Sequence, residues 1–420
     1  MRVLIAGAGI GGLTTALSLH AAGIEAAVVD AATELRPLGV GINLLPHAVR
    51  ELTELGLGDA LAATGVATGE MVHFDRHGGR IWGEPRGRAL GYDWPQYSVH
   101  RGELQMILLT AVRDRLGADA VRTGTLCEGF EQDGAAVRVR LRDRVSGAVE
   151  IVTADALVGA DGLHSTIRRA LHPDEPAPLW NGIRMWRGTV EGEPFLTGRT
   201  MAVAGSNTAA KLVVYPIAER GDKVLLNWVA EVKLTDGRPV GPADWSRAGR
   251  LADVLPHFAD WRFDWLDVPA MLAATDEILE YPMVDRDPLP SWGEGRVTLL
   301  GDAAHPMYPI GSNGGSQAVI DARVLAWELA RAADPAAGLA AYEAARRETV
   351  NAIVLACRDM PADRVLHTVG ERAPGGFDRV EDVLTSEELA TITGAYRQTS
   401  FSDAAALNAR PSLTPTLADR

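Results

Sequence analysis

The chain has 420 residues, of which 47% are apolar and 23% charged, and its formal net charge is −14. This composition is typical of a soluble globular protein, and the length requires one large domain or two closely joined ones. The negative charge argues against nucleic acid or an anionic membrane as a main partner, because both require a basic face.

The two cysteines, Cys127 and Cys357, lie far apart and lack CxxC spacing, so we expect reduced thiols in a reducing compartment. An apolar run begins almost directly after Met1, and we expect no signal peptide. No uncharged apolar run reaches the roughly 18–20 residues of a membrane helix. These features predict a soluble, cytoplasmic protein.

The first thirty residues have the layout of a dinucleotide-binding βαβ unit. An apolar run at 2–5 leads into a glycine-rich turn at 6–12, a helical stretch at 13–22 and a second apolar run that ends at Asp30. Strand, glycine turn, helix, strand and terminal acid occur in the order that this unit requires.

Each part of the turn has a physical purpose. Gly7 allows the tight turn, Gly9 lets the backbone approach a pyrophosphate, and Gly12 lets the helix pack closely on the strand. Phosphates would lie at the helix N-terminus, where free N–H groups and a partial positive charge are available. Asp30 would accept hydrogen bonds from ribose hydroxyls. The unit alone does not decide whether the bound dinucleotide is NAD, NADP or FAD.

The middle of the chain changes from mixed to sheet-rich. Residues 71–82 predict a hairpin, a strong amphipathic helix ends near Leu116, and alternating runs between 121 and 158 predict strands. From 180 to 232 the pattern is entirely β, and a short helix is expected at 251–263.

Buried-strand composition returns at 296–304 and is followed by a glycine-rich loop at 311–315 and helices at 317–332 and about 338–359. The expected architecture is an α/β, Rossmann-type nucleotide-binding domain, interrupted by a β-sheet substrate domain and followed by C-terminal helices. Its parts are the nucleotide domain (1–75, 96–178 and 283–360), the substrate domain (76–95 and 179–282) and a helical appendage with a loose tail (361–420).

Two later motifs complete the nucleotide site. Asp302 follows the strand at 296–304, so its carboxylate reaches the open end of the sheet, where it would accept from a ribityl chain or ribose. The loop at 311–315 offers backbone N–H groups to an electron-rich ring. At the third motif, Asp161 ends a strand, Ser165 is a candidate helix cap, and Arg168 is expected to pair with Asp161, with a structural role and nucleotide contact equally open.

Three motifs resemble those of the single-component (class A) flavin-dependent aromatic monooxygenases with the p-hydroxybenzoate hydroxylase fold: Gly7–Gly12, Asp161-Gly162 with Ser165 and Arg168, and Gly301-Asp302. The resemblance covers about residues 1–360. Four further stretches, 36–43, 96–105, 281–290 and 313–317, look closest to members of that family that hydroxylate phenazines.

The resemblance implies noncovalent FAD that NADH or NADPH reduces as a transient co-substrate. The reduced flavin would capture O₂ as a C4a-hydroperoxide and transfer one oxygen to an electron-rich, multi-ring aromatic acid, with or without loss of CO₂. The implied cofactor-binding residues are Gly7, Gly9, Ile10, Gly11, Gly12, Asp30, Arg36, Val40, Gly41, Ile42, Arg101, Asp161, Gly301, Asp302, Gly311, Asn313 and Gly314. Pro306 and the 311–314 loop would face the flavin ring.

Two residues depart from the family pattern. Asp30 stands where Glu is usual and is one methylene shorter. The loop reads Gly311-Ser312-Asn313-Gly314 instead of the commoner G-x-G-x-N.

The substrate pocket is expected where the β domain faces the flavin. Aromatic and methionine side chains suit a flat guest, and the candidates, for each of which core packing is the alternative, are Met185, Trp186, Tyr215, Trp228, Met307 and Tyr308. Arg184 and Arg187 are candidates for a substrate carboxylate, with surface ion pairs as the alternative. His305 and Pro306 are the candidate catalytic residues, although His305 is favoured as structural.

Other chemistries have less support. No metal site is expected, because the histidines are scattered and form no HxxxH motif or Cys/His cluster. Gly-x-Ser-x-Gly is absent, which argues against a hydrolase. The remaining alternatives are an epoxidase, a Baeyer–Villiger enzyme or an oxidase on the same fold, and a non-catalytic flavin-binding sensor. The partners are a small aromatic, O₂ and NAD(P)H, and the protein is either a monomer or a homodimer.

Overall fold

Strand β1 (Arg2–Ala6) lies inside a six-stranded sheet of the computed structural model, which describes residues 1–234, 247–359, 363–399 and 403–415. The sheet order is β20-β21-β12-β1-β2-β8, and only β20 runs antiparallel to its neighbour. The other strands are β2 (Glu25–Val29), β8 (Val121–Arg122), β12 (Ala156–Gly159), β20 (Gly293–Glu294) and β21 (Val297–Leu299). This parallel sheet confirms the Rossmann-type fold.

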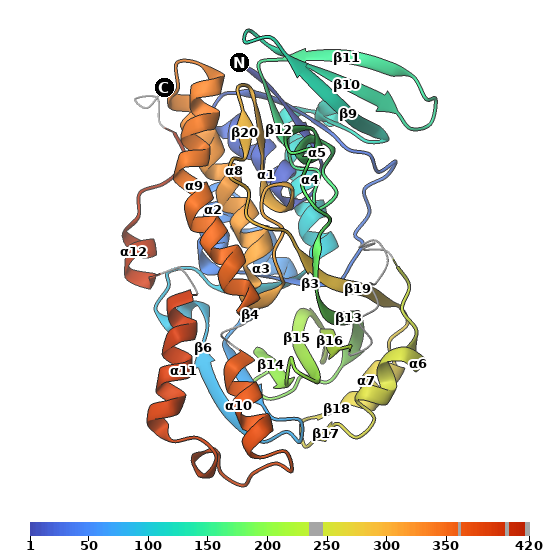
Figure 1. Cartoon of the computed structure of the whole chain (residues 1–420), viewed down its shortest axis with the longest axis vertical. Coiled ribbons are helices and arrows are strands. Elements are labelled where there is room, and N and C mark those ends of the chain that lie inside the picture. Colours follow the sequence, from blue (N-terminus) through green and yellow to red (C-terminus); the bar gives the residue numbers. More distant parts are fainter. Residues whose placement is uncertain (235–246, 360–362, 400–402, 416–420) are drawn as a thin grey trace.

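Helices cover this sheet (Figure 1). Helix α1 (Ile10–Ala21) packs against α4 (Arg101–Leu116) and α8 (Asn313–Arg331), and α8 packs against α9 (Pro335–Arg358). Helix α9 begins with Asp334 as N-cap, whose carboxylate accepts from the Ala336 N–H, and with Pro335 at the first helical position. The long expected helices are therefore confirmed, although α8 starts four residues before 317.

A second sheet, of seven strands, lies in the lower half of the molecule in Figure 1, with helices around it. Its order is β19-β13-β16-β15-β14-β5-β6, antiparallel except for the β14–β5 pair. The strands are β5 (Glu70–Phe74), β6 (Arg80–Pro85), β13 (Leu179–Gly192), β14 (Thr200–Gly205), β15 (Ala210–Arg220), β16 (Lys223–Lys233) and β19 (Ile278–Asp285). Because β5 belongs here, this sheet begins before the expected boundary at residue 76.

The two faces of the seven-stranded sheet bury different neighbours. One face, which we call the outer face, packs on α6 (Leu251–Val254) and α7 (Val268–Ala273) in a cluster drawn entirely from residues 72–278. The opposite face, the inner face, packs Met185 and Tyr281 against residues of the nucleotide domain that include Val40 and Tyr308. Successive residues of each strand therefore pack against different parts of the protein.

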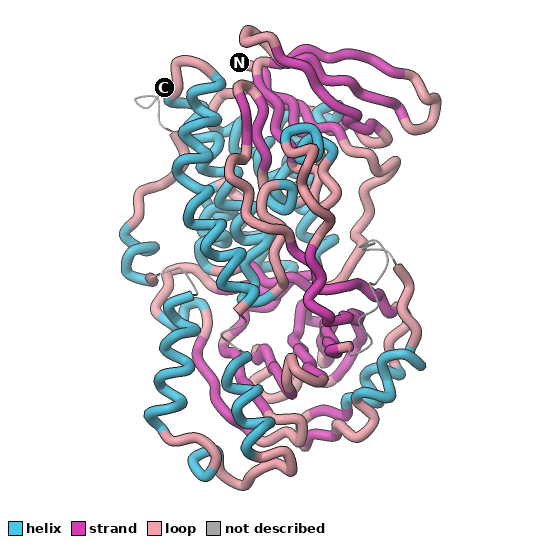
Figure 2. The backbone as a smooth tube through the Cα atoms, in the orientation of Figure 1, coloured by secondary structure: helices cyan, strands magenta, loops and turns pink. Residues whose placement is uncertain are grey.

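Smaller sheets complete the two halves. One three-stranded sheet, β11-β10-β9, projects at the edge of the nucleotide domain in Figure 2, and another, β3-β7-β4, joins the domains. The remaining elements are β3 (Gly41–Leu44), β4 (Val66–Thr68), β7 (Gln96–His100), β9 (Thr125–Gln132), β10 (Val137–Asp143), β11 (Val149–Ala154), β17 (Arg262–Phe263), β18 (Leu266–Asp267), α2 (Pro46–Glu54), α3 (Gly58–Thr64) and α5 (Thr166–Leu171).

Two local predictions need correction. The single helix expected at 251–263 is a short α6 followed by a 3₁₀ turn and β17, since Pro256 lies inside the segment and Trp261 turns into the outer-face core. Strand β19 was not predicted, and its residues complete the inner face beside β13.

The C-terminal region consists of α10 (Arg364–Arg372), α11 (Ser386–Thr399) and α12 (Ala404–Ala409), which returns to the nucleotide domain (Figure 1). The part of the expected loose tail that the structure describes, which ends at residue 415, is instead anchored. Arg50 donates to the carbonyl oxygens of Leu407 and Arg410 at 2.7 and 2.5 Å. The buried Arg323 guanidinium binds Glu51 at 3.0 Å and Thr414 at 2.6 Å. None of the helices in the described residues is long and apolar enough to cross a membrane.

Candidate active site

The glycine turn between β1 and α1 brings the three sequence motifs together. A Cβ on Gly7 would lie 2.2 Å from the Ala160 carbonyl oxygen, beside Asp161. One on Gly11 would lie 2.7 Å from the Leu300 side chain, beside Gly301. The first turn thus contacts the residues just before Asp161 and Asp302, although these residues lie about 150 and 290 positions further along the chain.

Within the turn, the glycines differ in what surrounds them. Gly7 has φ +112°, and a Cβ on Gly12 would lie 1.9 Å from the Gly7 carbonyl oxygen, so both are required by the backbone itself. Gly9 has φ −74° and no atom within 4 Å of its Cβ position. The space beside Gly9, at the N-terminus of α1, is therefore open to a ligand. Ile10 is the first residue of the helix.

Asp30 is hydrogen-bonded to the same turn. Its carboxylate accepts the Ala8 N–H and the Ala32 N–H, both at 2.7 Å. The shorter side chain at this position thus reaches the turn and holds it to the end of β2. A hydrogen bond from Asp30 to a ribose stays a prediction.

Asp302 lies in the 3₁₀ turn after β21, with Gly301 at φ +60°. A Cβ on Gly314 would be 3.9 Å from an Asp302 carboxylate oxygen, and one on Gly315 2.7 Å from Ile42. The Asp302 carboxylate is accessible to solvent, yet the protein around it reduces its hydration and raises its pKa, while His305 and Arg101 oppose that rise. An anionic oxygen, the N-terminus of α8 and strand β3 thus meet at one place.

The loop before α8 has an unusual backbone. Gly311 and Ser312 have φ values of +71° and +60°, and α8 already begins at Asn313, which is buried. The expected loop at 311–315 is therefore partly the first helical turn. This turn directs free N–H groups toward the space next to Asp302.

The Asp161 motif is a structural link. Asp161 accepts from Ser165 Oγ at 2.5 Å and from the Thr166 N–H at 2.8 Å, and burial raises its pKa. Ser165 caps α5, as expected, by accepting the Arg168 N–H.

The expected Arg168–Asp161 pair is wrong. The Arg168 guanidinium binds Glu175 at 2.5 Å and donates to the Ala303 and Ala304 carbonyl oxygens at 2.9 and 2.8 Å. Its side chain is long enough to reach the Asp302 turn, where it satisfies two carbonyl acceptors. Arg168 consequently fixes the second motif to the third.

His305 is enclosed by protein. Its Nε2 lies 2.5 Å from the Asp321 carboxylate, and Asp321 also binds Arg346 at 2.8 Å. Although burial opposes it, the neighbouring His305 and Arg346 side chains hold the pKa of Asp321 below its ordinary value. This arrangement matches the structural role favoured for His305. Pro306, the other candidate, is buried next to it.

Three of the implied cofactor-binding residues, Val40, Gly41 and Ile42, lie at the start of β3, beside the first turn of α4. Arg101 begins α4, and its N–H donates to the Val40 carbonyl oxygen at 2.9 Å. The Gly41 N–H donates to Asn227 Oδ1 at 2.7 Å. Arg36 is exposed and pairs with Glu34. Asn227 was missed by the sequence analysis, although it is a polar residue in the apolar strand β16.

The six candidate substrate residues divide between the two faces of the seven-stranded sheet. Met185 is on the inner face, with Met307 and Tyr308 against it. Tyr215, also directed inward, contacts Asn43 and Asn227, and burial raises its pKa to about 12.

Trp186 and Trp228 belong to the outer-face core, where they are 1% and 0% exposed. Their indole N–H groups donate to Glu280 and Thr275. Period-2 alternation explains the difference, because Trp186 follows Met185 and must point away from it. These two residues are removed from the candidate pocket.

Arg184 and Arg187 divide in the same way. Arg184 lies 3.6 Å from Glu280 on the outer face. Arg187 lies on the inner face, with its guanidinium 5.7 Å from the centre of the Tyr281 ring.

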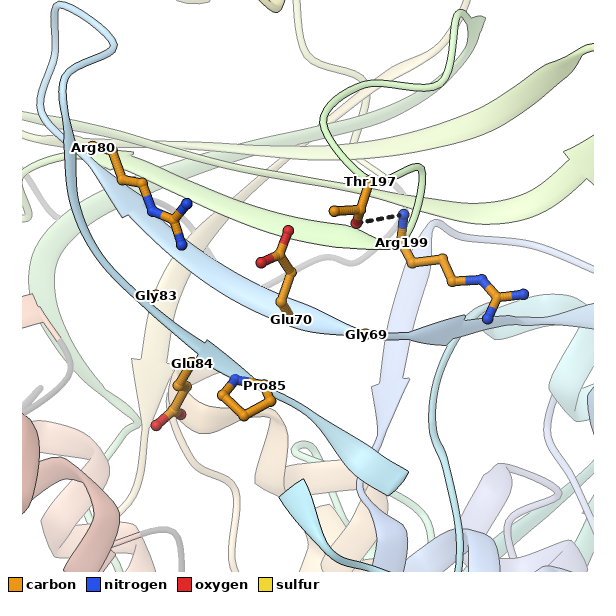
Figure 3. Close-up of a pocket in the computed structure, with 8 residues that line it drawn as sticks. All are labelled: Gly69, Glu70, Arg80, Gly83, Glu84, Pro85, Thr197 and Arg199. Atoms are coloured by element: carbon orange, nitrogen blue, oxygen red, sulfur yellow. Dashed lines mark hydrogen bonds between the residues drawn. The ribbon is translucent and has the colours of Figure 1, made fainter. Parts of the chain in front are cut away.

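A further pocket lies elsewhere. It has a volume of about 420 Å³ and lies between β5, β6 and the loop before β14. Figure 3 shows the residues that line it. It is lined by Gly69, Glu70, Arg80, Gly83, Glu84, Pro85, Thr197 and Arg199, none of which is a predicted site residue. Among the described residues, no group of three or more His, Cys, Asp or Glu side chains is placed to hold a metal ion.

The fold and the site define a dinucleotide-binding protein of the flavoprotein type. We propose that a pyrophosphate lies in the open space at Gly9, and that Asp302 with the α8 N-terminus holds the polar chain of a long dinucleotide such as FAD. No second glycine fingerprint is found in the sequence for a resident nicotinamide.

Comparisons with known proteins identify the family. The FAD binding domain family model matches residues 1–184 and 269–356. A phenazine 1,6-dicarboxylic acid hydroxylase of Lysobacter antibioticus is 51% identical over 94% of this chain and 96% of that protein. A 3-hydroxybenzoate 6-hydroxylase of Aquipseudomonas alcaligenes is 32% identical over 82% of this chain and 84% of that protein.

A solved structure agrees. Klebsiella pneumoniae HpxO, complexed with FAD and uric acid, superimposes with a TM-score of 0.72 at 26% identity, covering 97% of this chain and 95% of that one. The chain belongs to the FAD-binding aromatic hydroxylase family. It is an FAD-dependent monooxygenase that hydroxylates an aromatic compound with NAD(P)H and O₂.

Proposed function

We propose that this monooxygenase hydroxylates a carboxylated phenazine or a similar fused-ring aromatic acid. The similarity to the phenazine 1,6-dicarboxylic acid hydroxylase, which extends over nearly the whole of both chains, supports this substrate class. The observation that carries it within the structure is the environment of Arg187.

The environment of Arg187 suits a ligand that carries a negative charge. The Arg187 side chain is half-buried on the inner face of β13, and its Nε has no hydrogen-bond partner in the described residues. None of those residues places a carboxylate in an ion pair with it. This half-buried guanidinium makes no direct ion pair, and a ligand carboxylate would give it the charge-assisted hydrogen bonds that it lacks.

The surroundings of Arg187 suit a flat ring system. Its guanidinium stacks against Tyr281, and Met185, Met307 and Tyr308 belong to the same cluster. Aromatic and thioether groups make favourable contacts with an aromatic guest. The polar end of the guest would lie at Arg187 and its rings over the apolar groups.

Bound FAD supplies the redox chemistry, taking electrons from NAD(P)H and activating O₂. The protein itself positions the substrate and shields the reacting groups from water. Arg187 fixes the carboxylate and therefore which ring carbon is presented, and the α8 N-terminus favours negative charge beside Asp302. The inner-face cluster excludes water from the reacting groups. If the carbon presented carries the carboxylate, hydroxylation releases CO₂, and trapping of that CO₂ distinguishes the two outcomes.

Arg187→Gln tests the assignment. Loss of a charge-assisted contact worth about 1.5–3 kcal/mol should raise KM for phenazine-1,6-dicarboxylic acid roughly 10- to 100-fold, with a smaller change in kcat. NAD(P)H consumption as a function of substrate concentration measures both constants. An uncharged phenazine should bind equally to both proteins.

Arg184→Gln is the matched control, since Arg184 lies on the same strand but on the outer face. It should leave KM unchanged. Equal kinetics for the two variants would remove Arg187 from the site.

A further inference from the structure

A compact group of buried charges adjoins Arg187 on the inner face. Lys211 Nζ lies 2.9 Å from the Glu231 carboxylate and 3.1 Å from that of Asp363. The three side chains are 2%, 4% and 7% exposed. Asn207 Nδ2 donates to Asp363 at 2.5 Å. The cluster joins β15 and β16 to the chain just before α10.

Strand register connects this cluster to Arg187. Glu231 is the cross-strand partner of Met185 on one side and of Lys211 on the other. Arg187 is two residues beyond Met185 and therefore on the same face, in the diagonal position relative to Glu231. Diagonal neighbours have Cα atoms about 7–8 Å apart, which is within electrostatic reach of long side chains.

The four charges balance when the protein is free of substrate. Arg187 and Lys211 supply two positive charges, and Glu231 and Asp363 two negative ones. A substrate carboxylate on Arg187 would leave this buried group with one excess negative charge. Burial makes such an excess expensive, and proton uptake by a carboxylate is the least costly way to cancel it.

Glu231 is the carboxylate best suited to accept that proton. Asp363 accepts from two donors, Lys211 and Asn207, whereas within the described part of the chain Lys211 is the only donor placed at Glu231. Burial raises the pKa of Glu231, and Lys211 opposes that rise. His73, on β5, which β14 separates from β15, has its pKa lowered by burial to about 4 and is uncharged near neutral pH.

We propose that Glu231 takes up one proton from bulk water when a substrate carboxylate binds at Arg187. This proposal rests on the proposed function for the location of the carboxylate. One O–H bond forms on a Glu231 oxygen as the proton leaves hydronium or a buffer acid in solution, and no other covalent bond of the protein or the substrate changes. Glu231 thereby adjusts the charge of the pocket so that a buried carboxylate is accommodated.

The direction in which pH changes substrate affinity follows from proton linkage. Because the complex holds one proton more than the free protein, raising the pH disfavours binding. Between the pKa of Glu231 in the free protein and its higher pKa in the complex, Kd should increase about tenfold per pH unit.

Calorimetric titration of the oxidised, FAD-loaded enzyme with phenazine-1,6-dicarboxylic acid, without NAD(P)H, tests the proposal. The binding enthalpy is measured in buffers of different ionisation enthalpy, and the slope gives the number of protons exchanged. The wild-type protein should take up about one proton per substrate. Glu231→Gln should bind with an uptake near zero, and a phenazine without carboxyl groups should cause no uptake in either protein.

Glu280→Gln is the control for a buried, ion-paired glutamate on the outer face, and it should retain the wild-type uptake. Binding of the diacid to the wild-type protein without proton uptake would overturn the proposal, even if Glu231→Gln does not fold. Uptake that persists in Glu231→Gln would also overturn it. An Arg187→Gln variant that binds the diacid with unchanged affinity would instead contradict the proposed function.

Discussion

Gly9→Ala is expected to give a folded but colourless protein. The backbone of Gly9 has φ −74° and ψ −176°, which alanine adopts without strain, and its added Cβ would meet no protein atom within 4 Å. The methyl group would instead occupy the space proposed for the pyrophosphate. An overpacking cost of about 1–3 kcal/mol lowers FAD affinity roughly 10- to 100-fold. Flavin absorbance of the purified protein and its thermal unfolding measure the two properties separately.

Two other glycines provide controls. Gly12→Ala should destabilise the fold itself, because its Cβ would lie 1.9 Å from the Gly7 carbonyl oxygen. Gly370→Ala, in α10, has no atom within 4 Å of the Cβ position and should leave flavin content unchanged. A Gly9→Ala protein with full flavin content would refute the location of the pyrophosphate.

Asp302→Ala should lower FAD affinity about tenfold or more, because a charge-assisted hydrogen bond contributes about 1.5–3 kcal/mol. Asp302 is placed for this bond by the 3₁₀ turn after β21 and lies beside the first turn of α8. Titration of the flavin-free protein with FAD, followed by flavin fluorescence, measures the affinity.

Asp302→Asn separates charge from shape. It should weaken FAD binding less than the alanine variant, since an amide oxygen still accepts a hydrogen bond. If both variants bind FAD as the wild-type protein does, the Asp302 carboxylate has no part in holding the cofactor.

The nucleotide domain could be predicted from local pattern because its signals are continuous in the chain. The turn requires glycine at Gly7 and Gly12 because the backbone around them leaves no room for a Cβ, and the glycine pattern is visible in the sequence. The buried strand before Asp302 likewise predicts that Asp302 lies at the edge of a parallel sheet. The contact of both later motifs with that turn was expected from the fold and is what the structure shows.

The substrate face could not be read in the same way. Trp186 and Trp228 have the composition of a binding pocket, yet only strand register decides which face a side chain occupies. Arg168 was paired with Asp161, seven residues before it, but binds Glu175, seven residues after it, so separation along the chain does not decide between the two acids. Glu231 and Asp363 are separated by more than a hundred residues, and only folding brings both to Lys211.

The relatives explain why fold alone does not identify the substrate. Proteins similar to this chain include hydroxylases named for phenazine 1,6-dicarboxylic acid, 3-hydroxybenzoate and urate. One fold supports these activities, and the differences lie in the groups that surround the guest. On the inner face, the combination of Arg187 with the Lys211–Glu231–Asp363 cluster is the feature that we expect to select an acidic substrate.

The central claim is tested most directly by oxygen labelling. The FAD-loaded enzyme is supplied with phenazine-1,6-dicarboxylic acid, NAD(P)H and ¹⁸O₂, and the product is analysed by mass spectrometry. We expect one ¹⁸O atom in a new ring hydroxyl group and one NAD(P)H consumed per product formed. A product without ¹⁸O, or NAD(P)H consumption that yields only hydrogen peroxide with this and related fused-ring acids, would contradict the account.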